Sequence, residues 1–223
     1  MIDNTKSFKE IGETYNNDKV THHRYDLIYP LFLEGLRKET FNTLEIGLGD
    51  GKYDTGMSSY LFKEYFPNSN HFIMDINFEY KDDFATVIKG DQSKTEDLEK
   101  VKKIVENAKL IIDDGSHHPR HQFISFCYLF ENLLENGGYY IIEDTECNYW
   151  SKNSNIYGYT IGYDNVFDFF KRQIDAVNSE YSNKENSLNI SMITFAKNCI
   201  IIKKQTLEEI EINNREYRFK HLL

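Results

Sequence analysis

The chain is poor in residues and patterns that mark several classes of protein. Its 223 residues include only three prolines, one tryptophan and three cysteines. The cysteines are scattered and odd in number, so we expect reduced thiols in a cytoplasmic protein and neither a disulfide framework nor a zinc site. The apolar runs are far shorter than the roughly 20 residues of a membrane-spanning helix, and the first residues lack the apolar core of a signal peptide. We therefore expect no membrane span.

Basic residues are also too few for a nucleic-acid-binding surface. Lys and Arg total 26 against 36 Asp and Glu, which gives a formal net charge of -10, and no basic stripe stands out. Nucleic acid is therefore not expected as the main partner. Aromatic residues, in contrast, make up 15% of the chain, with 16 Tyr and 16 Phe. Together with a hydrophobic content of 40%, they favour one globular α/β domain whose core and pocket walls contain many rings.

Short apolar runs alternate with helical patterns from residue 41 onward. We predict strands at 42–46, 71–75, 86–89, 110–113 and 139–143, and helices at 57–66, 95–108, 121–134 and 166–180. This alternation is typical of a doubly wound, Rossmann-like sheet that is mostly parallel with helices on both faces. The runs 188–195 and 199–204, joined by a short link, predict an antiparallel C-terminal hairpin.

We assign the whole chain, 1–223, to one domain with three parts. Residues 1–40 form an N-terminal helical segment, 41–204 the Rossmann-like core, and 205–223 a C-terminal tail. Asn136-Gly137-Gly138 is expected to close the helix 121–134 as its C-cap.

A glycine-rich turn follows the first predicted strand. It contains Gly47, Gly49 and Gly51, and such glycines allow a tight turn and a close approach of the backbone to a ligand. The spacing is not that of the dinucleotide fingerprint. The next strand ends in Asp75, which is placed to bond ribose hydroxyls, and Gly90-Asp91-Gln92 follows the third strand, where an adenine amine could be bound.

Acidic residues end two further predicted strands. Asp113 and Asp114 end one, and Glu143 and Asp144 end the next. Ligands of open α/β sheets bind at the carboxyl ends of the strands. Three carboxylates within about 4 Å repel by roughly 4 kcal/mol per pair at an effective dielectric near 20, and a divalent cation relieves this repulsion. Oxygen ligands suit Mg²⁺ or Mn²⁺ better than Zn²⁺.

We therefore predict Asp114, Glu143 and Asp144 as metal ligands. His117 is the candidate catalytic base for a hydroxyl group near the metal. Asp113 belongs either to the cofactor side of the site or simply to the strand end. Other interpretations remain open, since the carboxylates could cap the following helices and His117 could be a structural histidine.

The order of these motifs resembles the class I S-adenosylmethionine-dependent methyltransferases over about residues 41–204. Within that class, the chain is similar to the metal-dependent sugar O-methyltransferases of macrolide biosynthesis, the mycinamicin type, and to related proteins known as cephalosporin hydroxylases. The resemblance is carried by Leu44-Glu45-Ile46-Gly47, by 63–68, by Gly90-Asp91-Gln92, by 113–117 and by 142–145; Asp18-Lys19 followed by His22 and Tyr25 resembles a segment before the catalytic core.

The resemblance implies S-adenosylmethionine as cofactor and transfer of its methyl group to a hydroxyl of a sugar, a glycoside or a surface-polysaccharide precursor. It also implies that Glu45 helps to hold the methionine end of the cofactor, and that the chain could form a homo-oligomer. Three alternatives stay open: a non-sugar acceptor, a hydroxylase, and a non-catalytic cofactor-binding partner subunit. The hydroxylase lacks support because no two-His-one-carboxylate iron pattern is evident.

Two segments after the fifth strand could contribute to an acceptor site. Tyr149 and Trp150 could form a wall of the pocket, although core packing would explain them equally well. Residues 153–164 are polar and rich in tyrosine, so they are either a lid over the acceptor or a surface loop.

Overall fold

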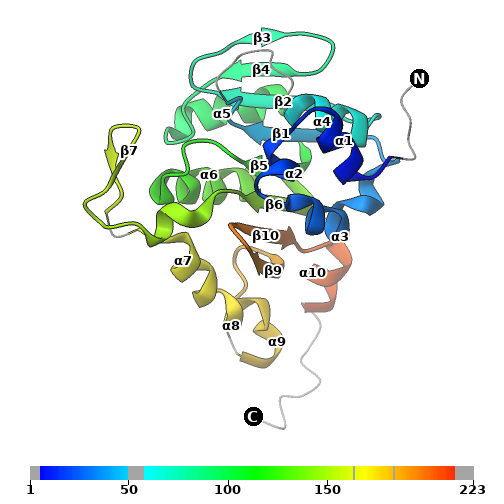
Figure 1. Cartoon of the computed structure of the whole chain (residues 1–223). Helices are drawn as coiled ribbons and strands as arrows, with labels where there is room; N and C mark the ends of the chain where they lie inside the picture. Colours follow the sequence, from blue (N-terminus) through cyan, green and yellow to red (C-terminus); the bar gives the residue numbers. More distant parts are fainter. Residues whose placement is uncertain (1–5, 50–57, 163, 183, 214–223) are drawn as a thin grey trace.

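An eight-stranded mixed sheet forms the centre of the molecule (Figure 1). The structure is a computed structural model and describes residues 6–49, 58–162, 164–182 and 184–213. The strand order is β3-β4-β2-β1-β5-β6-β10-β9. The strands are β1 (Asn42–Ile46), β2 (Asn70–Asp75), β3 (Tyr80–Lys81), β4 (Thr86–Lys89), β5 (Ala108–Asp113), β6 (Leu134–Ile142), β9 (Ile190–Ala196) and β10 (Cys199–Lys204).

The sheet has the predicted topology. Strands β4, β2, β1, β5 and β6 run parallel to one another, whereas β10 pairs antiparallel with both β6 and β9. The doubly wound fold with an antiparallel C-terminal hairpin is therefore confirmed. The short edge strand β3, antiparallel to β4, was not expected.

Helices cover both faces of the sheet. One face carries the N-terminal helices and α4, and the other carries α5, α6 and α7. The first group comprises α1 (Phe8–Thr14), α2 (Asp18–Thr21), η1 (Tyr25–Leu27), α3 (Tyr29–Leu33), η2 (Glu34–Leu36) and α4 (Ser58–Tyr65); the second comprises α5 (Thr95–Val105), α6 (Pro119–Asn132) and α7 (Val166–Arg172). Each group forms its own apolar cluster with the sheet.

Side chains alternate between these two clusters along each central strand. In β5, Leu110 and Ile112 pack with the N-terminal helices, and Ile111 packs with α6. The same alternation sends Asp113 toward the α6 face. In β6, Ile141 packs on the N-terminal face, and so Glu143, two residues later, points to that face too. The alternation of side chains along the strands therefore places Asp113 against α6 and Glu143 against the N-terminal helices.

The predicted C-cap at Asn136-Gly137-Gly138 is wrong. Helix α6 ends at Asn132, and β6 begins at Leu134 and runs through both glycines. Leu134 pairs with Ala108 and Tyr139 pairs with Leu110, so the residues between them form an irregularity in the strand. Gly137 has a φ of 76° and donates its amide to the carbonyl of Gln205. The glycines thus permit a bulge in β6 and do not end the helix.

The helix predicted at 166–180 is broken into three short helices. They are α7, α8 (Ile174–Val177) and α9 (Ser179–Ser182). Residues 153–164 contain a small two-stranded ribbon, β7 (Asn155–Ile156) and β8 (Tyr159–Thr160), and the tail begins with α10 (Leu207–Asn213). The ribbon is tied to the rest of the molecule because His118 Nε2 lies 2.9 Å from the carbonyl oxygen of Thr160.

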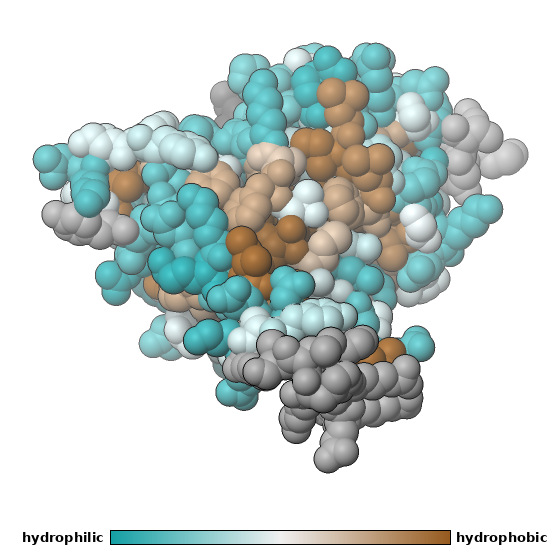
Figure 2. Space-filling model, turned by 90° about the horizontal axis from the view of Figure 1, so that it is seen from below, coloured by the Kyte–Doolittle hydropathy of each residue, from teal (hydrophilic) through white to brown (hydrophobic). Residues whose placement is uncertain are grey.

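The described residues contain no helix that is long and apolar enough to span a bilayer. All three cysteines are unpaired, as predicted. Apolar side chains nevertheless reach the surface, and Figure 2 shows them gathered along the middle of the lower face between polar neighbours. The exposed apolar residues include Leu27 and Leu31 of the N-terminal segment.

Candidate active site

The glycine turn after β1 crosses the loop that follows β5. Gly47 has a φ of 97°, and a Cβ atom at this position would lie 2.2 Å from the carbonyl oxygen of Asp114. Only glycine fits this crossing. Asp75, at the end of β2, accepts a hydrogen bond from the amide of Leu48 at 3.1 Å. Gly49, with a φ of 77°, continues the turn, and the predicted Gly51 lies outside the described residues.

Glu45 is buried directly before this turn. Its Oε2 accepts a hydrogen bond from the hydroxyl of Ser58 at 2.6 Å, and Nε2 of His71 lies 3.4 Å away. Its Oε1 lies 3.4 Å from Nζ of Lys19. Burial alone would raise the pKa of Glu45, but Lys19, His71 and Ser58 hold this pKa below its ordinary value. Glu45 is therefore an anion whose position is fixed.

Asp113 and Gln92 form a buried pair behind the loop after β5. The Gln92 amide nitrogen donates to Asp113 Oδ1 at 2.9 Å, and the Ser125 hydroxyl donates to Asp113 Oδ2 at 2.6 Å. Gln92 Oε1 accepts from the amide of Ser116 at 2.7 Å. Burial raises the pKa of Asp113 although Ser125 and Gln92 oppose the shift. Both side chains are thus occupied in supporting the loop.

The predicted residue Asp91 also uses its side chain locally. Its Oδ1 accepts hydrogen bonds from the amide and the hydroxyl of Ser93, at 2.9 and 2.7 Å. Its amide donates to Asp97 at 2.9 Å. Asp91 therefore shapes the turn between β4 and α5.

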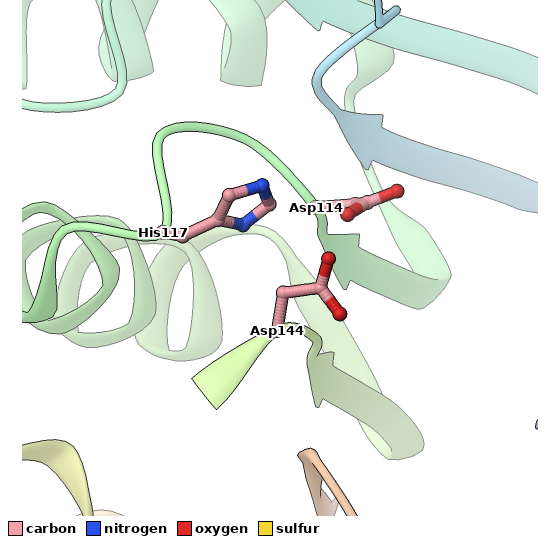
Figure 3. A group of neighbouring side chains, drawn as sticks. All are labelled: Asp114, His117 and Asp144. Carbon is pink, nitrogen blue, oxygen red and sulfur yellow. The ribbon is translucent and has the colours of Figure 1, made fainter. Parts of the chain in front are cut away.

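Asp114, His117 and Asp144 converge at the carboxyl ends of β5 and β6 (Figure 3). One possible ligand atom from each residue lies within 4.8 Å of the others. His117 and Asp144 have φ values of 53° and 48°, in the left-handed region that non-glycine residues seldom adopt. Within the described residues, Nδ1 of His117 is buried without a hydrogen-bond partner. Two strained residues and an unsatisfied nitrogen in one group are typical of a ligand site.

Asp144 is anchored by three residues from two other segments. Its Oδ1 lies 3.0 Å from the Tyr25 hydroxyl, 2.9 Å from the Asn198 amide nitrogen and 3.3 Å from Nδ1 of His23. Asn198 stands in the turn between β9 and β10. The N-terminal segment and the C-terminal hairpin therefore position the same carboxylate.

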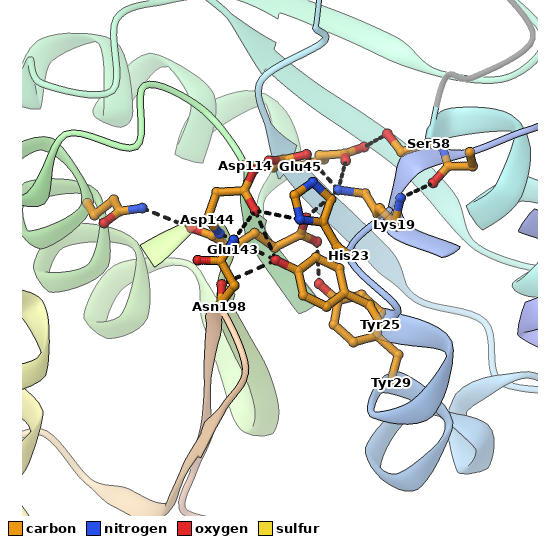
Figure 4. Close-up of polar contacts among 12 residues, drawn as sticks. Lys19, His23, Tyr25, Tyr29, Glu45, Ser58, Asp114, Glu143, Asp144 and Asn198 are labelled. Carbon is orange, nitrogen blue, oxygen red and sulfur yellow. Dashed lines mark hydrogen bonds and ion pairs between the residues drawn. The ribbon is translucent and has the colours of Figure 1, made fainter. Parts of the chain in front are cut away.

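Glu143 lies beside this group but is turned toward the N-terminal helices (Figure 4). Its Oε2 accepts a hydrogen bond from Nζ of Lys19 at 2.7 Å, and its Oε1 accepts one from the Tyr29 hydroxyl. Lys19 also contacts Asp114 at 2.6 Å and Glu45 at 3.4 Å. One buried ammonium group therefore connects Glu45, at the glycine turn, with Asp114 and Glu143 at the carboxyl ends of β5 and β6. We call these two strand ends, with Asp114, Glu143 and Asp144, the acidic edge of the sheet.

The charges in this region remain unbalanced in favour of the carboxylates. Burial raises the pKa values of Asp114 and Glu143 although Lys19 opposes both shifts. Burial would lower the pKa of Lys19, but Asp114, Glu143 and Glu45 raise it well above its ordinary value. Glu45, Asp114 and Glu143 share one ammonium group, and Asp144 adds a fourth carboxylate close to Asp114. The residues therefore fit a divalent cation, which would offset the remaining negative charge.

A cavity of about 680 Å³ opens beside Asp144. His23 and Asn198 belong both to its wall and to the anchors of Asp144. Tyr149 is one of its wall residues, whereas Trp150 is not among them. The described residues of the lining are His22, His23, Thr145, Glu146, Tyr149, Phe167, Lys171, Phe195, Ala196, Lys197 and Asn198.

Comparison with known proteins finds sugar O-methyltransferases among the relatives. The chain is 33% identical over 152 residues to L-olivosyl-oleandolide 3-O-methyltransferase of Streptomyces antibioticus, an alignment that covers 66% of this chain and 39% of the relative. It is 32% identical over 132 residues to mycinamicin VI 2''-O-methyltransferase of Micromonospora griseorubida, which covers 57% of this chain and 33% of that protein. No family model matches the chain.

A solved structure extends the similarity to nearly the whole chain. The methyltransferase MycE of the mycinamycin pathway, in complex with Mg, SAH and mycinamycin VI, matches with a TM-score of 0.78 and 25% identity. The match covers 90% of this chain and 54% of MycE. The chain is a class I S-adenosylmethionine-dependent methyltransferase in fold, and it resembles the mycinamicin type. It spans 39% and 33% of the two sequence relatives, so it matches only part of each.

Lys19, Tyr25, Tyr29 and Asn198 of this methyltransferase fold were not predicted as site residues. Asp18-Lys19 and Tyr25 were noticed only as part of a similar segment, and their pattern does not reveal where a short helix places its side chains. Asn198 lies in a hairpin turn, far in sequence from Asp144. His118 is the N-cap of α6 and His121 lies in the first turn of that helix, and both are buried.

Proposed function

We propose that the chain is an O-methyltransferase that uses S-adenosylmethionine and Mg²⁺, or Mn²⁺, to methylate a hydroxyl group of a sugar or glycoside. The observation that carries the proposal is the convergence of Asp114, His117 and Asp144 at the sheet edge that also holds the glycine turn. Three sequence relatives support the same reaction, since they are O-methyltransferases named for L-olivosyl-oleandolide, mycinamicin VI and an α-L-rhamnosyl tetracenomycin.

The cofactor would lie against the carboxyl ends of β1, β2 and β4. S-adenosylmethionine, when bound, supplies the methyl group as a sulfonium. Glu45 would hold its methionine end, the turn of Gly47, Gly49 and Gly51 would let it approach the backbone, and Asp75 would bind the ribose. Asp91, Gln92 and Asp113 complete the proposed cofactor side; the bonds that occupy their side chains make them supports of the surrounding loops.

The metal would lie at the ends of β5 and β6. Asp114 and Asp144 are its proposed ligands, with Glu143 as the third carboxylate. A divalent cation, when bound there, lowers the pKa of a hydroxyl group that it polarises. Lys19 fixes Asp114 and Glu143 relative to each other, while Tyr25 and Asn198 fix Asp144.

His117 would accept the proton of the acceptor hydroxyl. Its Nδ1 is buried and lacks a partner among the described residues, so a hydroxyl placed between Asp114 and Asp144 would satisfy it. The left-handed backbone of His117 directs the imidazole toward the two carboxylates, as Figure 3 shows. Holding the hydroxyl in line with the methyl group would account for much of the remaining rate enhancement.

Calorimetric titration with S-adenosylmethionine, followed by a methyl-transfer assay with and without EDTA, tests the proposal. We expect cofactor binding and transfer that EDTA abolishes and added Mg²⁺ restores. Absence of cofactor binding would refute the cofactor assignment. Full transfer in EDTA would refute the role of the metal.

The variant His117→Ala tests the proton acceptor separately. We expect cofactor affinity to stay within about twofold while turnover falls by about 10²–10⁴-fold, the range of a lost general base. A turnover close to that of the wild-type chain would show that His117 only borders the metal.

The acceptor class is the second part of the proposal. The proposed acceptor is a precursor of a surface polysaccharide, made in the cytoplasm, or another glycoside. A mass-spectrometric product assay on glycosides, sugar nucleotides and non-sugar alcohols distinguishes these classes. Self-assembly, which size-exclusion chromatography with light scattering would measure, is proposed only by resemblance.

A further inference from the structure

The cavity beside Asp144 has an aromatic wall. The ring centroids of Tyr149 and Phe167 lie 5.2 Å apart, and those of Phe167 and Phe195 lie 6.0 Å apart. The interplanar angles are 38° and 36°, so the three rings form a gently tilted surface. Tyr149 and Phe195 are exposed to solvent. Such a wall suits the C–H face of a sugar ring, because contact removes apolar area of both partners from water.

The charged groups of the same cavity are mainly basic. Among the described lining residues, Lys171 and Lys197 are basic and Glu146 is the one acidic residue. This balance is the reverse of that of the whole chain, whose formal net charge is -10. A local excess of basic groups on an acidic protein attracts anions to that place.

Lys171 remains available to a ligand although it has a neighbour of opposite charge. Its Nζ lies 3.3 Å from Asp168 Oδ1, and both side chains are largely exposed. An exposed pair one helical turn apart contributes little free energy. An anion in the cavity can therefore compete for this ammonium group.

We propose that this cavity binds an acceptor that carries an anionic group, a phosphate ester or a carboxylate, beside its sugar ring. The inference rests on the proposed function and specifies its substrate class. The carboxylates of Asp144 and its neighbours repel an anion, whereas Lys171 and Lys197 attract it. The charged end of the acceptor therefore lies at the lysines, and the sugar crosses the aromatic wall with a hydroxyl toward Asp144 and His117.

The cavity is large enough for this arrangement. Its volume of about 680 Å³ falls inside the range of roughly 300–1,000 Å³ that is usual for small-molecule sites. A sugar phosphate, a nucleotide-linked sugar and a uronic acid share the required chemistry. Their relative affinities for the chain show which of these three compounds supplies the anionic group.

The test measures acceptor affinity by calorimetry in the presence of S-adenosylhomocysteine and Mg²⁺. The ligands are a methyl hexoside, the matching hexose 1-phosphate, the nucleoside diphosphate hexose and the methyl hexuronide. We expect at least one anionic ligand to bind about tenfold more tightly than the methyl hexoside, and the ratio to fall as salt is added. The anionic ligand with the highest affinity identifies the source.

The double variant Lys171→Gln/Lys197→Gln is expected to lose most of this ratio. The matched control is Lys103→Gln, which removes an exposed ammonium group from α5, outside the cavity, and should keep the ratio. Unchanged S-adenosylhomocysteine affinity in each variant shows that the fold is intact.

The inference would be overturned if charged and neutral ligands bound with equal affinity, or if the double variant kept the ratio of anionic-ligand to methyl hexoside affinity. Failure of all four ligands to bind would overturn it as well. Methyl transfer to a neutral glycoside would then leave the proposed function standing. If the wild-type chain does not bind S-adenosylhomocysteine, the proposed function itself is wrong.

Discussion

At the scale of single residues, the most informative side chain is Lys19. It is 1% exposed and contacts Glu45, Asp114 and Glu143. A buried ammonium group is stable only with such partners, and the partners in turn depend on it. Asp114 belongs both to the contacts of Lys19 and to the group with His117 and Asp144, so Lys19 contributes to the position of this group.

Replacement of Lys19 by methionine should therefore destabilise the fold strongly. We expect the free energy of unfolding to fall by about 3–5 kcal/mol, because the buried Glu45 and Glu143 and the partly buried Asp114 lose their counter-charge. Denaturant titration measures the loss, and Mg²⁺ should recover part of it by binding the folded state. The control Lys103→Met, at an exposed position of α5, should change stability by no more than about 0.5 kcal/mol. A loss no larger than that of the control would contradict the role of Lys19.

His121 predicts a dependence of stability on pH. Burial, with a smaller contribution from His118, lowers the pKa of His121 to about 4. The folded state thus keeps this imidazole neutral where the unfolded state, with a pKa near 6.5, takes up a proton. Stability should be unaffected by His121 above about pH 6.5 and should fall as the pH drops toward 4. In His121→Gln this part of the pH dependence should disappear; identical pH profiles of unfolding would contradict the assignment.

At the scale of elements, the packing of α1 against α2 determines where Lys19 lies. A Cβ atom on Gly12 of α1 would be 2.2 Å from Cγ2 of Val20 in α2. Gly12 therefore allows the close contact of these helices, and Val20 directly follows Lys19. The glycine at this position affects the site through the helix that carries the lysine.

The variant Gly12→Ala should push α2 away from the sheet. We expect a loss of about 1–3 kcal/mol, because the clash outweighs the better helix propensity of alanine. Mg²⁺ affinity should fall as well, since the carboxylates held by Lys19 move. Gly35→Ala is the matched control: nothing lies within 4 Å of its Cβ position, so stability should not fall and Mg²⁺ affinity should stay at the wild-type value. Equal behaviour of the two variants would show that the contact between the helices is unimportant.

The elements also show which features a sequence can predict. Strands β1 and β4 begin and end where their apolar patterns do, and the ends of β5 and β6 brought Asp114 and Asp144 together as expected. The helix end predicted at Gly137 and Gly138 was wrong, because a glycine that permits a bulge in a strand cannot be distinguished in the sequence from one that ends a helix. Lys19 was missed because its contacts depend on how a four-residue helix packs on the sheet, which no periodicity records.

At the scale of the whole molecule, one edge of the sheet collects segments that are far apart in the chain. The glycine turn, the acidic strand ends, the N-terminal helices and the β9–β10 hairpin all meet there (Figures 1 and 4). The acidic edge lies between the glycine turn and the basic, aromatic cavity. This arrangement would place a methyl donor, a cation and an acceptor side by side, in this order, along the carboxyl ends of the strands.

The central claim is that Asp114 and Asp144 form a divalent metal site beside the cofactor. Binding of Mn²⁺, followed by electron paramagnetic resonance with S-adenosylhomocysteine present, tests it most directly, with Asp144→Asn as the variant and Asp168→Asn, an exposed acid on α7, as its control. We predict one bound Mn²⁺ in the wild-type chain and the control, displaced by Mg²⁺, and an affinity at least about tenfold weaker in Asp144→Asn. The absence of bound Mn²⁺ in the folded wild-type chain, or unchanged affinity in Asp144→Asn, would contradict the account.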